Sequence, residues 1–492
     1  MASENSEFVK YVSHPKTSNF ECYIFSEEQL MILNKLKPVT LHVDATGTVI
    51  RPTTLKKKKQ EKRLLYYAAV IKANDHMMPV AEFVSTDQST TAISSWLYAF
   101  KLFATERGFD LSDLIANVTS DFSTAIIKSL AQTFNECKDV IDYLDQCYDY
   151  LYVNKPMKSK IILNLCCCHL VKNISDDVFK YYGAAGKTNK KIDLARIVVG
   201  FVTPAFDLKM VNYLDKCFTA LCTIILSPYQ NGDVQKFIDF LIELNNSVMM
   251  VLNSKEYKDF ENILFLNSDG TQVDDLKTNP LSKEKYKASK FYGRFAKMSR
   301  DIRASFTLDN EGVANEFYNE EYFSDFMGSV VPVIPMWTCL MIRVYSKTEV
   351  CHRPNNSGVE LWFHYLKGNS LQAKSMKFSR FIRLTRDRIE SLAKEVLCDI
   401  PNTRFKTVTD LSDDEDAEQW KPRKNKKIGY FMQGSLMANM KKFKPNQVIH
   451  EKAEIVDLTT ISDENKQITE SNMITPRSVQ TVKTFSTPGS YS

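Results

Sequence analysis

Three carboxylates that are far apart in the sequence each occupy a setting that could present a side chain to a divalent metal ion. Asp44 follows the apolar run 39–43, and Asp121 follows the run 114–120. Both runs have the composition of buried strands, so we expect each aspartate at the C-terminal edge of a strand. Glu360 lies in residues 355–366, which read as the first turns of a helix.

These three side chains point to phosphoryl transfer on nucleic acid. Hard divalent ions prefer oxygen ligands, and a pair of them promotes in-line attack on a phosphodiester. Taken singly, Asp44 and Asp121 read as strand-end turn residues and Glu360 as an exposed helix charge. Their order, the apolar approach to each aspartate and the Asn-Asn step before Glu360 together favour a site for two Mg²⁺ or Mn²⁺ ions.

Several short motifs resemble, in the same order, the catalytic domain of Mutator-like (MULE) transposases. They lie at residues 41–47, 65–71, 79–84, 118–126, 166–169 and 355–360. This resemblance covers roughly residues 38 to 395 and implies a DDE transposase with a ribonuclease-H-like fold, which cuts and rejoins DNA ends with two metal ions. It implies that Asp44, Asp121 and Glu360 are the catalytic, metal-binding triad, and that Cys166 and His169 are the family's Cys-x-x-His pair.

Cys166 and His169 are three residues apart, close enough on one helical face to serve one site. A zinc site needs two further ligands, and apart from Cys351 and His352 no close pair is present to supply them, so we predict no zinc. A buried cysteine with a hydrogen-bonded histidine supporting the wall of the site is the alternative. As a hypothesis, His169 orients a carboxylate or a DNA phosphate. Metal-dependent nicking that survives in His169→Ala would contradict it.

The composition of the 492-residue chain excludes several classes of protein. Hydrophobic residues make up 44% and charged residues 25%, which are ordinary values for a folded protein, while the net charge of +5 neither demands nor forbids a nucleic-acid partner. Eleven cysteines, an odd number that includes the triplet 166–168, do not form the framework of a secreted domain, so a reducing interior is expected. We see no secretory signal, and the most apolar stretch, residues 330–344, is too short and interrupted for a membrane span.

The order of the predicted elements indicates an α/β protein. Three consecutive strand-like runs at 39–44, 64–72 and 77–85 are followed by a helical pattern at 90–107 and a fourth strand at 114–120. A helical pattern at 124–134 and a candidate fifth strand at 161–165 come next. We expect a ribonuclease-H-like mixed sheet with flanking helices, interrupted by a large helical insertion domain and followed by a disordered C-terminal tail. The expected divisions are a lead-in at 1–37, a first catalytic part at 38–185, the insertion at 186–345, final catalytic helices at 346–400 and the tail at 401–492.

The basic run 56–63 is either a solvated loop or a contact for DNA phosphates, and residues 421–427 suit nuclear import. Residues 454–459 resemble a SUMO-interacting motif, in which Ile455, Val456, Asp457 and Leu458 would add a short strand to a partner's sheet. These features favour a nuclear protein, with DNA as partner and SUMO or SUMOylated proteins as a further one. Homo-oligomer formation is left open, and no membrane partner is expected.

Two functions follow from this interpretation. The first is a MULE-type transposase-like protein that cleaves and transfers DNA strands. The second is a transposase-derived, domesticated or truncated adaptor without catalytic activity, because residues 1–37 contain a single cysteine, Cys22, and no evident DNA-binding module.

Overall fold

The computed structural model describes residues 8–13, 19–47, 49–54, 61–73, 76–182, 211–251, 286–306, 313–338, 340–344, 356–367 and 375–398. The chain divides into two units, Met1–Asp414 and Glu415–Ser492, and every described residue lies in the first. The predicted tail, with its basic run and its SUMO-interacting segment, therefore lies outside the described residues, as does most of the basic run at 56–63.

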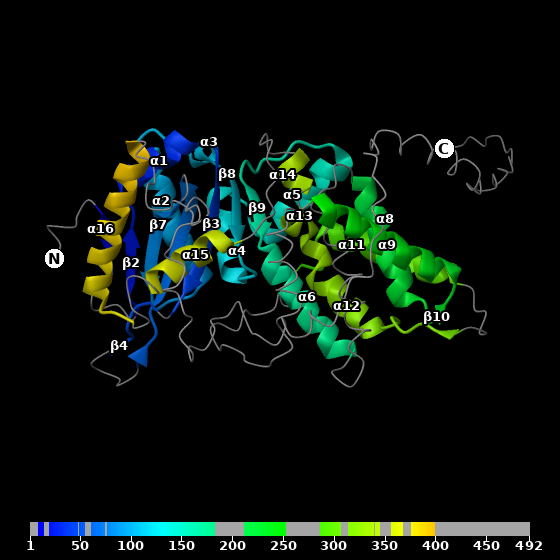
Figure 1. The fold of residues 1–492 in the computed structure, drawn as a ribbon. Coiled ribbons are helices and arrows are strands. Elements are labelled where there is room, and N and C mark those ends of the chain that lie inside the picture. Colours follow the sequence, from blue (N-terminus) through cyan, green and yellow to red (C-terminus); the bar gives the residue numbers. More distant parts are fainter. Residues whose placement is uncertain are drawn as a thin grey trace, which may run out of the picture. The chain divides into compact units, whose positions relative to one another are not determined.

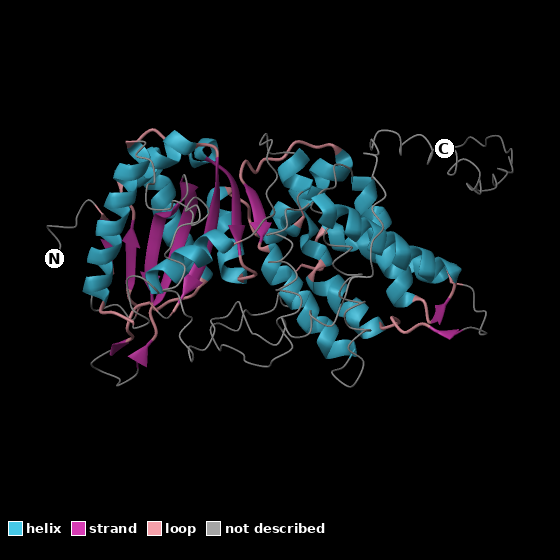
Figure 2. Ribbon diagram, in the orientation of Figure 1, coloured by secondary structure: helices cyan, strands magenta, loops and turns pink. Residues whose placement is uncertain are grey.

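The first unit contains a seven-stranded sheet (Figure 2). Its order is β1-β2-β7-β6-β3-β8-β9, where the strands are Val9–Val12 (β1), Glu21–Ile24 (β2), Val39–Thr46 (β3), Leu65–Ala73 (β6), His76–Ser85 (β7), Ile115–Ser120 (β8) and Ile162–Leu165 (β9). Neighbours from β1 to β3 are antiparallel, whereas β3, β8 and β9 are parallel. The sheet is therefore mixed, and the fold is α/β. Two further two-stranded sheets pair Thr53–Thr54 (β4) with Glu61–Lys62 (β5), and Tyr229–Gln230 (β10) with Val313–Ala314 (β11).

Helices precede, separate and follow these strands (Figure 1). Those within the strand-rich part are Glu27–Leu36 (α1), Thr90–Thr105 (α2), Leu111–Leu114 (α3), Thr124–Phe134 (α4), Val140–Val153 (α5) and Cys167–Tyr182 (α6). Between β9 and the last two helices come Val211–Leu226 (α8), Gly232–Val251 (α9), Lys290–Ser305 (α11), Glu320–Ser329 (α12), the 3-10 helix Val331–Val333 (η3), Ile334–Trp337 (α13) and Leu340–Val344 (α14). The chain returns to the sheet with Ser357–Tyr365 (α15) and Phe378–Leu397 (α16).

The two faces of the sheet are covered by different helices. Consecutive residues of β6 point to opposite faces. Tyr67 lies against Trp96 of α2, with ring centroids 6.4 Å apart. Its neighbour Tyr66 lies against Phe363 of α15 and Phe381 of α16, with centroids 5.7 and 4.9 Å apart. Helices α15 and α16 therefore cover one face and α2 the other.

The predicted strands and helices of the strand-rich part are confirmed, with boundaries shifted by a few residues. The N-terminal segment 1–37 differs from the expectation of a lead-in. It contributes α1 and two strands, and β2 pairs with β7 through partners such as Tyr23 with Phe83. Its strands are only four residues long, too short for their alternation to be distinguished from an irregular polar segment.

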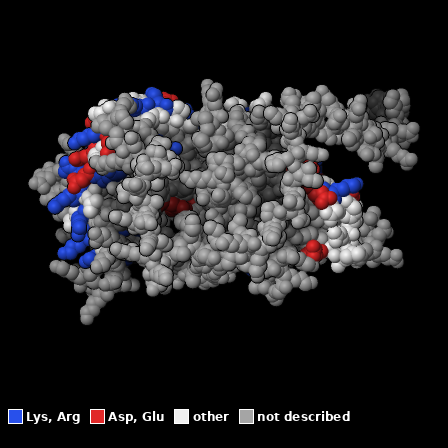
Figure 3. Space-filling model, viewed as in Figure 1, with Lys and Arg blue, Asp and Glu red and all other residues white. Residues whose placement is uncertain are grey.

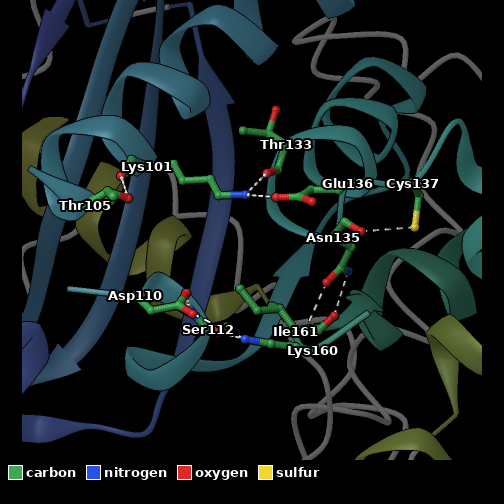
Figure 4. Close-up of polar contacts among 10 residues, drawn as sticks. All are labelled: Lys101, Thr105, Asp110, Ser112, Thr133, Asn135, Glu136, Cys137, Lys160 and Ile161. Carbon is green, nitrogen blue, oxygen red and sulfur yellow. Dashed lines mark hydrogen bonds and ion pairs between the residues drawn. The ribbon is translucent and has the colours of Figure 1, made fainter. Parts of the chain in front are cut away.

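A buried asparagine fixes the start of β9 (Figure 4). Asn135, at the end of α4, donates from Nδ2 to the Ile161 carbonyl at 2.7 Å and accepts from the Ile161 amide at 3.1 Å. Next to it, Lys101 of α2 donates to the Thr133 carbonyl at 3.2 Å and pairs with Glu136 at 2.7 Å. These contacts join α2, α4 and β9, and β9 leads directly into Cys166.

One described stretch, Glu320–Ile342, has the length and hydropathy of a membrane-spanning helix. Of its most apolar window, 88% is buried inside the fold, and prolines Pro332 and Pro335 divide it into several short helices. It occupies the position of a core segment.

Candidate active site

The sheet brings Asp44 and Asp121 next to each other. Strands β3 and β8 are parallel, with Val43 beside Ser120. Asp44 and Asp121 are the next residues on the two chains, so their Cα atoms are neighbours about 5 Å apart. Asp121 directly follows β8, as expected. Asp44 does not end its strand, because β3 continues to Thr46.

Helix α15 lies against the sheet face to which Asp44 points. His42 and Asp44 are two residues apart on β3 and so share a face. A Cβ atom at Gly358 of α15 would lie 3.1 Å from Cδ2 of His42 and 3.2 Å from Sδ of Met77. A larger side chain would crowd this contact, so glycine allows α15 to lie close to β3. Glu360 follows two residues later in the first turn of α15, on the exposed side of the helix, and its carboxylate lies near His169.

The three carboxylates influence one another electrostatically. Burial, the charge of Asp121 and the charge of Glu360 raise the pKa of Asp44 well above its usual range. A hydrogen bond of 2.7 Å from the Ala45 amide and the charge of Lys367 lower it in part. Burial also raises the pKa of Asp121, and Glu360 adds to that increase. Like charges in a poorly hydrated region disfavour ionisation of each group. The site therefore concentrates negative charge that a cation would relieve.

His169 supplies positive charge to this cluster. Its Nε2 atom lies 3.8 Å from Oε1 of Glu360, and it lowers the pKa of Asp121. Burial by itself lowers the pKa of His169, but Cys166, Glu360 and Asp121 together raise it to about 9. These neighbours favour the protonated form of the imidazole, which lies beside Glu360.

Asn356, which immediately precedes α15, joins the elements that carry the site. Its buried side chain donates from Nδ2 to the Val43 carbonyl at 3.3 Å, next to Asp44. Its backbone amide donates to Sγ of Cys166 at 3.2 Å, and the Cys166 amide donates to the Ser120 carbonyl at 2.8 Å, next to Asp121. Cys166 is thus buried, and its sulfur accepts a hydrogen bond from the residue that precedes α15. Apart from the Asn-Asn step, no sequence pattern distinguishes Asn356.

Asn356→Ala is expected to lower the free energy of unfolding by about 1–3 kcal/mol, because it leaves the buried Val43 carbonyl without its donor. Urea unfolding followed by circular dichroism measures the change. Asn212→Ala, at an exposed position on α8, is the control and should change stability little. Equal stability of the two variants would show that the Asn356 hydrogen bond contributes nothing.

A second buried chain of hydrogen bonds reaches α15 from the sheet. Nε1 of Trp362 donates to the Tyr66 hydroxyl at 2.9 Å, and that hydroxyl donates to Oε1 of Glu82. Glu82 is fully buried on β7, and burial raises its pKa to about 8, partly offset by the Tyr66 bond. Trp362 therefore fills the core beside Glu360.

The donor chemistry of the site suits hard divalent ions, since Asp44, Asp121 and Glu360 offer only carboxylate oxygens and their mutual repulsion favours a bound cation. As their side chains lie here, the residues that the structure describes contain no group of three or more His, Cys, Asp or Glu arranged to hold a metal ion. Oε1 of Glu360 lies 3.8 Å from Nε2 of His169.

Comparison with known proteins gives one partial sequence match of note. No protein-family model matches the chain. The chain is similar to the 120.7 kDa protein in NOF-FB transposable element of Drosophila melanogaster, with 29% identity over 142 residues. The match covers 28% of this chain and spans only 13% of the length of that relative. The fold and this match together define a mixed α/β protein, part of which is similar to a protein of a transposable element.

A solved structure, the Drosophila P element transposase strand transfer complex, aligns with 76% of this chain and 82% of its own chain. The TM-score is 0.33 and the sequence identity 13%, a likeness too weak to carry an argument.

Proposed function

We propose that the chain is a transposase-like phosphoryl transferase that cleaves DNA and transfers its strands, with a ribonuclease-H-like catalytic domain of the MULE type. The observation that carries the proposal is that the parallel pairing of β3 with β8 brings Asp44 beside Asp121, while Glu360 lies near His169, which follows β9 in the same sheet. The partial likeness to a transposable-element protein supports it.

In this proposal the three carboxylates hold two Mg²⁺ or Mn²⁺ ions. Bound ions of this kind activate a water or a DNA 3′-hydroxyl and stabilise the departing 3′-oxygen. The chain's own part is to place the carboxylates by strand register and by α15. The protonated His169 side chain holds Glu360 or a DNA phosphate in position. A nuclear location and SUMO binding through residues 455–458 belong to the same proposal.

The test is nicking of supercoiled plasmid by the purified full chain with Mn²⁺ or Mg²⁺. We expect nicked circles that a chelator abolishes, and loss of activity in Asp44→Asn, Asp121→Asn and Glu360→Gln alike. Nicking that all three variants retain would exclude the triad.

The alternative function is an adaptor derived from a transposase. It predicts DNA or partner binding that none of the three substitutions changes, without any nicking. The same assay, combined with a binding measurement, therefore separates the two functions.

A further inference from the structure

Helix α16 presents a row of basic side chains to solvent, which we name the basic face of α16. Its members are Lys377, Arg380 and Arg383, all exposed and spaced three residues apart. Residues three apart are neighbours on a helix surface. Lys and Arg side chains gather over this part of the molecule in Figure 3, with acidic groups between some of them. Arg51, also exposed, lies beside the start of the helix, because its Nε donates to the Ser375 carbonyl at 2.9 Å.

The opposite side of α16 anchors the helix. Phe381, Ile389 and Leu392 are buried against the rest of the fold. An amphipathic helix fixed in this way holds its polar side chains in a defined row. The basic face is thus presented by a rigid element.

The basic face differs from the other arginines of the same helix. Arg386 pairs with Glu390 at 2.6 Å, and Arg388 lies over the Tyr365 ring at 4.9 Å. Within the described part of the chain, neither Arg380 nor Arg383 forms an ion pair. Their charges are therefore free to meet a ligand.

The N-terminal end of α16 is joined to the strand that carries Asp44. Ile50, six residues after Asp44, forms a β-bridge with Met376. The Arg51 amide donates to the Met376 carbonyl at 2.8 Å, and the Met376 amide donates to the Val49 carbonyl at 3.1 Å. The basic face therefore begins where the chain emerges from the sheet beyond the candidate active site.

The basic face also borders a hollow of about 370 Å³. The described residues that line it are Ser379, Arg380, Arg383, Leu384 and Asp387. Two guanidinium groups and a hydroxyl supply donors for anionic oxygens, whereas Asp387 closes the row with an opposite charge. The anion-binding part is thus the N-terminal half of the helix.

The spacing of the basic face suits a nucleic-acid backbone. From Lys377 to Arg383 the helix rises about 9 Å at 1.5 Å per residue. A DNA strand places one phosphate every 3.4 Å along its axis, so two or three phosphates face this row. A membrane surface fits less well, because Leu384 is the one apolar residue of the described lining and is half-buried.

We propose that the basic face of α16 binds the sugar-phosphate backbone of the DNA duplex that flanks the bond to be cut. The choice of DNA rests on the proposed function. Contacts of this kind position a duplex without reading its sequence. They would extend the DNA-binding surface beyond the carboxylate site without taking part in the chemistry.

The test compares two triple variants of the full chain with the same change of charge. One is Lys377→Gln, Arg380→Gln and Arg383→Gln. The control replaces three exposed lysines on α4 and beside α5 by glutamine: Lys128, Lys138 and Lys158. Fluorescence anisotropy measures binding of a labelled duplex at several salt concentrations.

We expect the slope of log affinity against log salt to fall by about three in the α16 variant, roughly 0.9 for each phosphate that is no longer neutralised, and to stay unchanged in the control. The single variant Arg383→Gln should lower it by about one. Circular dichroism and urea unfolding confirm that each variant is folded. An α16 variant that binds with wild-type affinity and slope would overturn the inference, as would failure of the wild-type chain to bind duplex DNA.

The catalytic proposal and this inference fail in different ways. Asp44→Asn should lose nicking yet keep the salt dependence of the wild type, and the α16 variant should lose binding. If the wild type binds DNA through α16 but never nicks it, the inference holds while the catalytic function falls. If the wild type nicks and the α16 variant binds as tightly as the control, the inference falls alone.

Discussion

Asp44→Asn is expected to reduce metal-dependent nicking by at least about a thousandfold, because stabilisation by the bound ions contributes several kcal/mol to such reactions. Asparagine keeps the size of the side chain and removes one anionic ligand. The substitution also leaves an acceptor for the Ala45 amide, which bonds to Oδ1 of Asp44. Nicking rates under single-turnover conditions, with enzyme in excess over plasmid, measure the effect on the chemical step.

In the absence of metal, Asp44→Asn is expected to maintain or raise the stability of the fold. Asp44 is crowded by the charges of Asp121 and Glu360, so removing its charge relieves repulsion. In chelator, Asp44→Asn should therefore be at least as stable as the wild type, while Mn²⁺ should raise the Tm of the wild type and not that of the variant. Asp301→Asn, at an exposed position on α11, is the control and should nick normally. A wild-type nicking rate in Asp44→Asn would show that this carboxylate takes no part.

The strands that carry the aspartates were predictable because their composition is distinctive. The runs before Asp44 and Asp121 are rich in valine, leucine and isoleucine, and buried parallel strands show this composition. The parallel pairing of β3 with β8 then places the two aspartates side by side, as expected. Their role as metal ligands stays a prediction.

Hydrogen bonds between residues that are far apart in the sequence were harder to predict. Asn356 forms hydrogen bonds with Cys166 and Val43, which precede it in the chain by 190 and 313 residues. A long helical region separates Asn356 from both of them. No local pattern marks an asparagine as the donor to a distant carbonyl. Glu82 lies within the apolar β7 and gives no sign from sequence alone that its partner is Tyr66. Such contacts depend on the tertiary pairing of strands and not on local propensity.

The strands of the N-terminal segment could not be predicted from their own sequence. Its strands are too short for a periodicity, and their identity as strands depends on the edge that β7 offers. Pairing with an existing edge, more than intrinsic preference, accounts for β2. The edge of β7 exists only in the folded sheet, so the local sequence of β2 does not reveal it.

Glu82→Gln is expected to remove a loss of unfolding free energy that the wild type suffers between pH 4.5 and 8 and that approaches about 5 kcal/mol. Burial raises the pKa of Glu82 from 4.5 to about 8 in the folded chain. Between these values the folded state binds about one proton more than the unfolded state. The free energy of unfolding therefore falls as pH rises, by about 1.4 kcal/mol per pH unit, and levels off above the folded pKa.

Glutamine imitates the protonated carboxyl and does not titrate. Its Oε1 can still accept the Tyr66 hydroxyl, so the buried chain through Trp362 to α15 is retained. Near pH 5 the variant and the wild type should have similar stability. At pH 8 the variant should be the more stable. Folding of the wild type must then either bury the charged carboxylate or take up a proton from a solution of low proton concentration, and both cost free energy.

Urea unfolding of both proteins at pH 5, 6, 7 and 8, conditions chosen to span about the range between the two pKa values, measures this difference directly. Glu28→Gln, at an exposed position in the first turn of α1, controls for the loss of one carboxylate and should run parallel to the wild type at every pH. If Glu82→Gln also runs parallel, Glu82 is ionised and hydrated in the folded chain, and the sheet face under α15 is open to water. If the curves diverge as expected, a neutral carboxyl lies beneath the helix that carries Glu360, and the placement of that helix depends on a dry core.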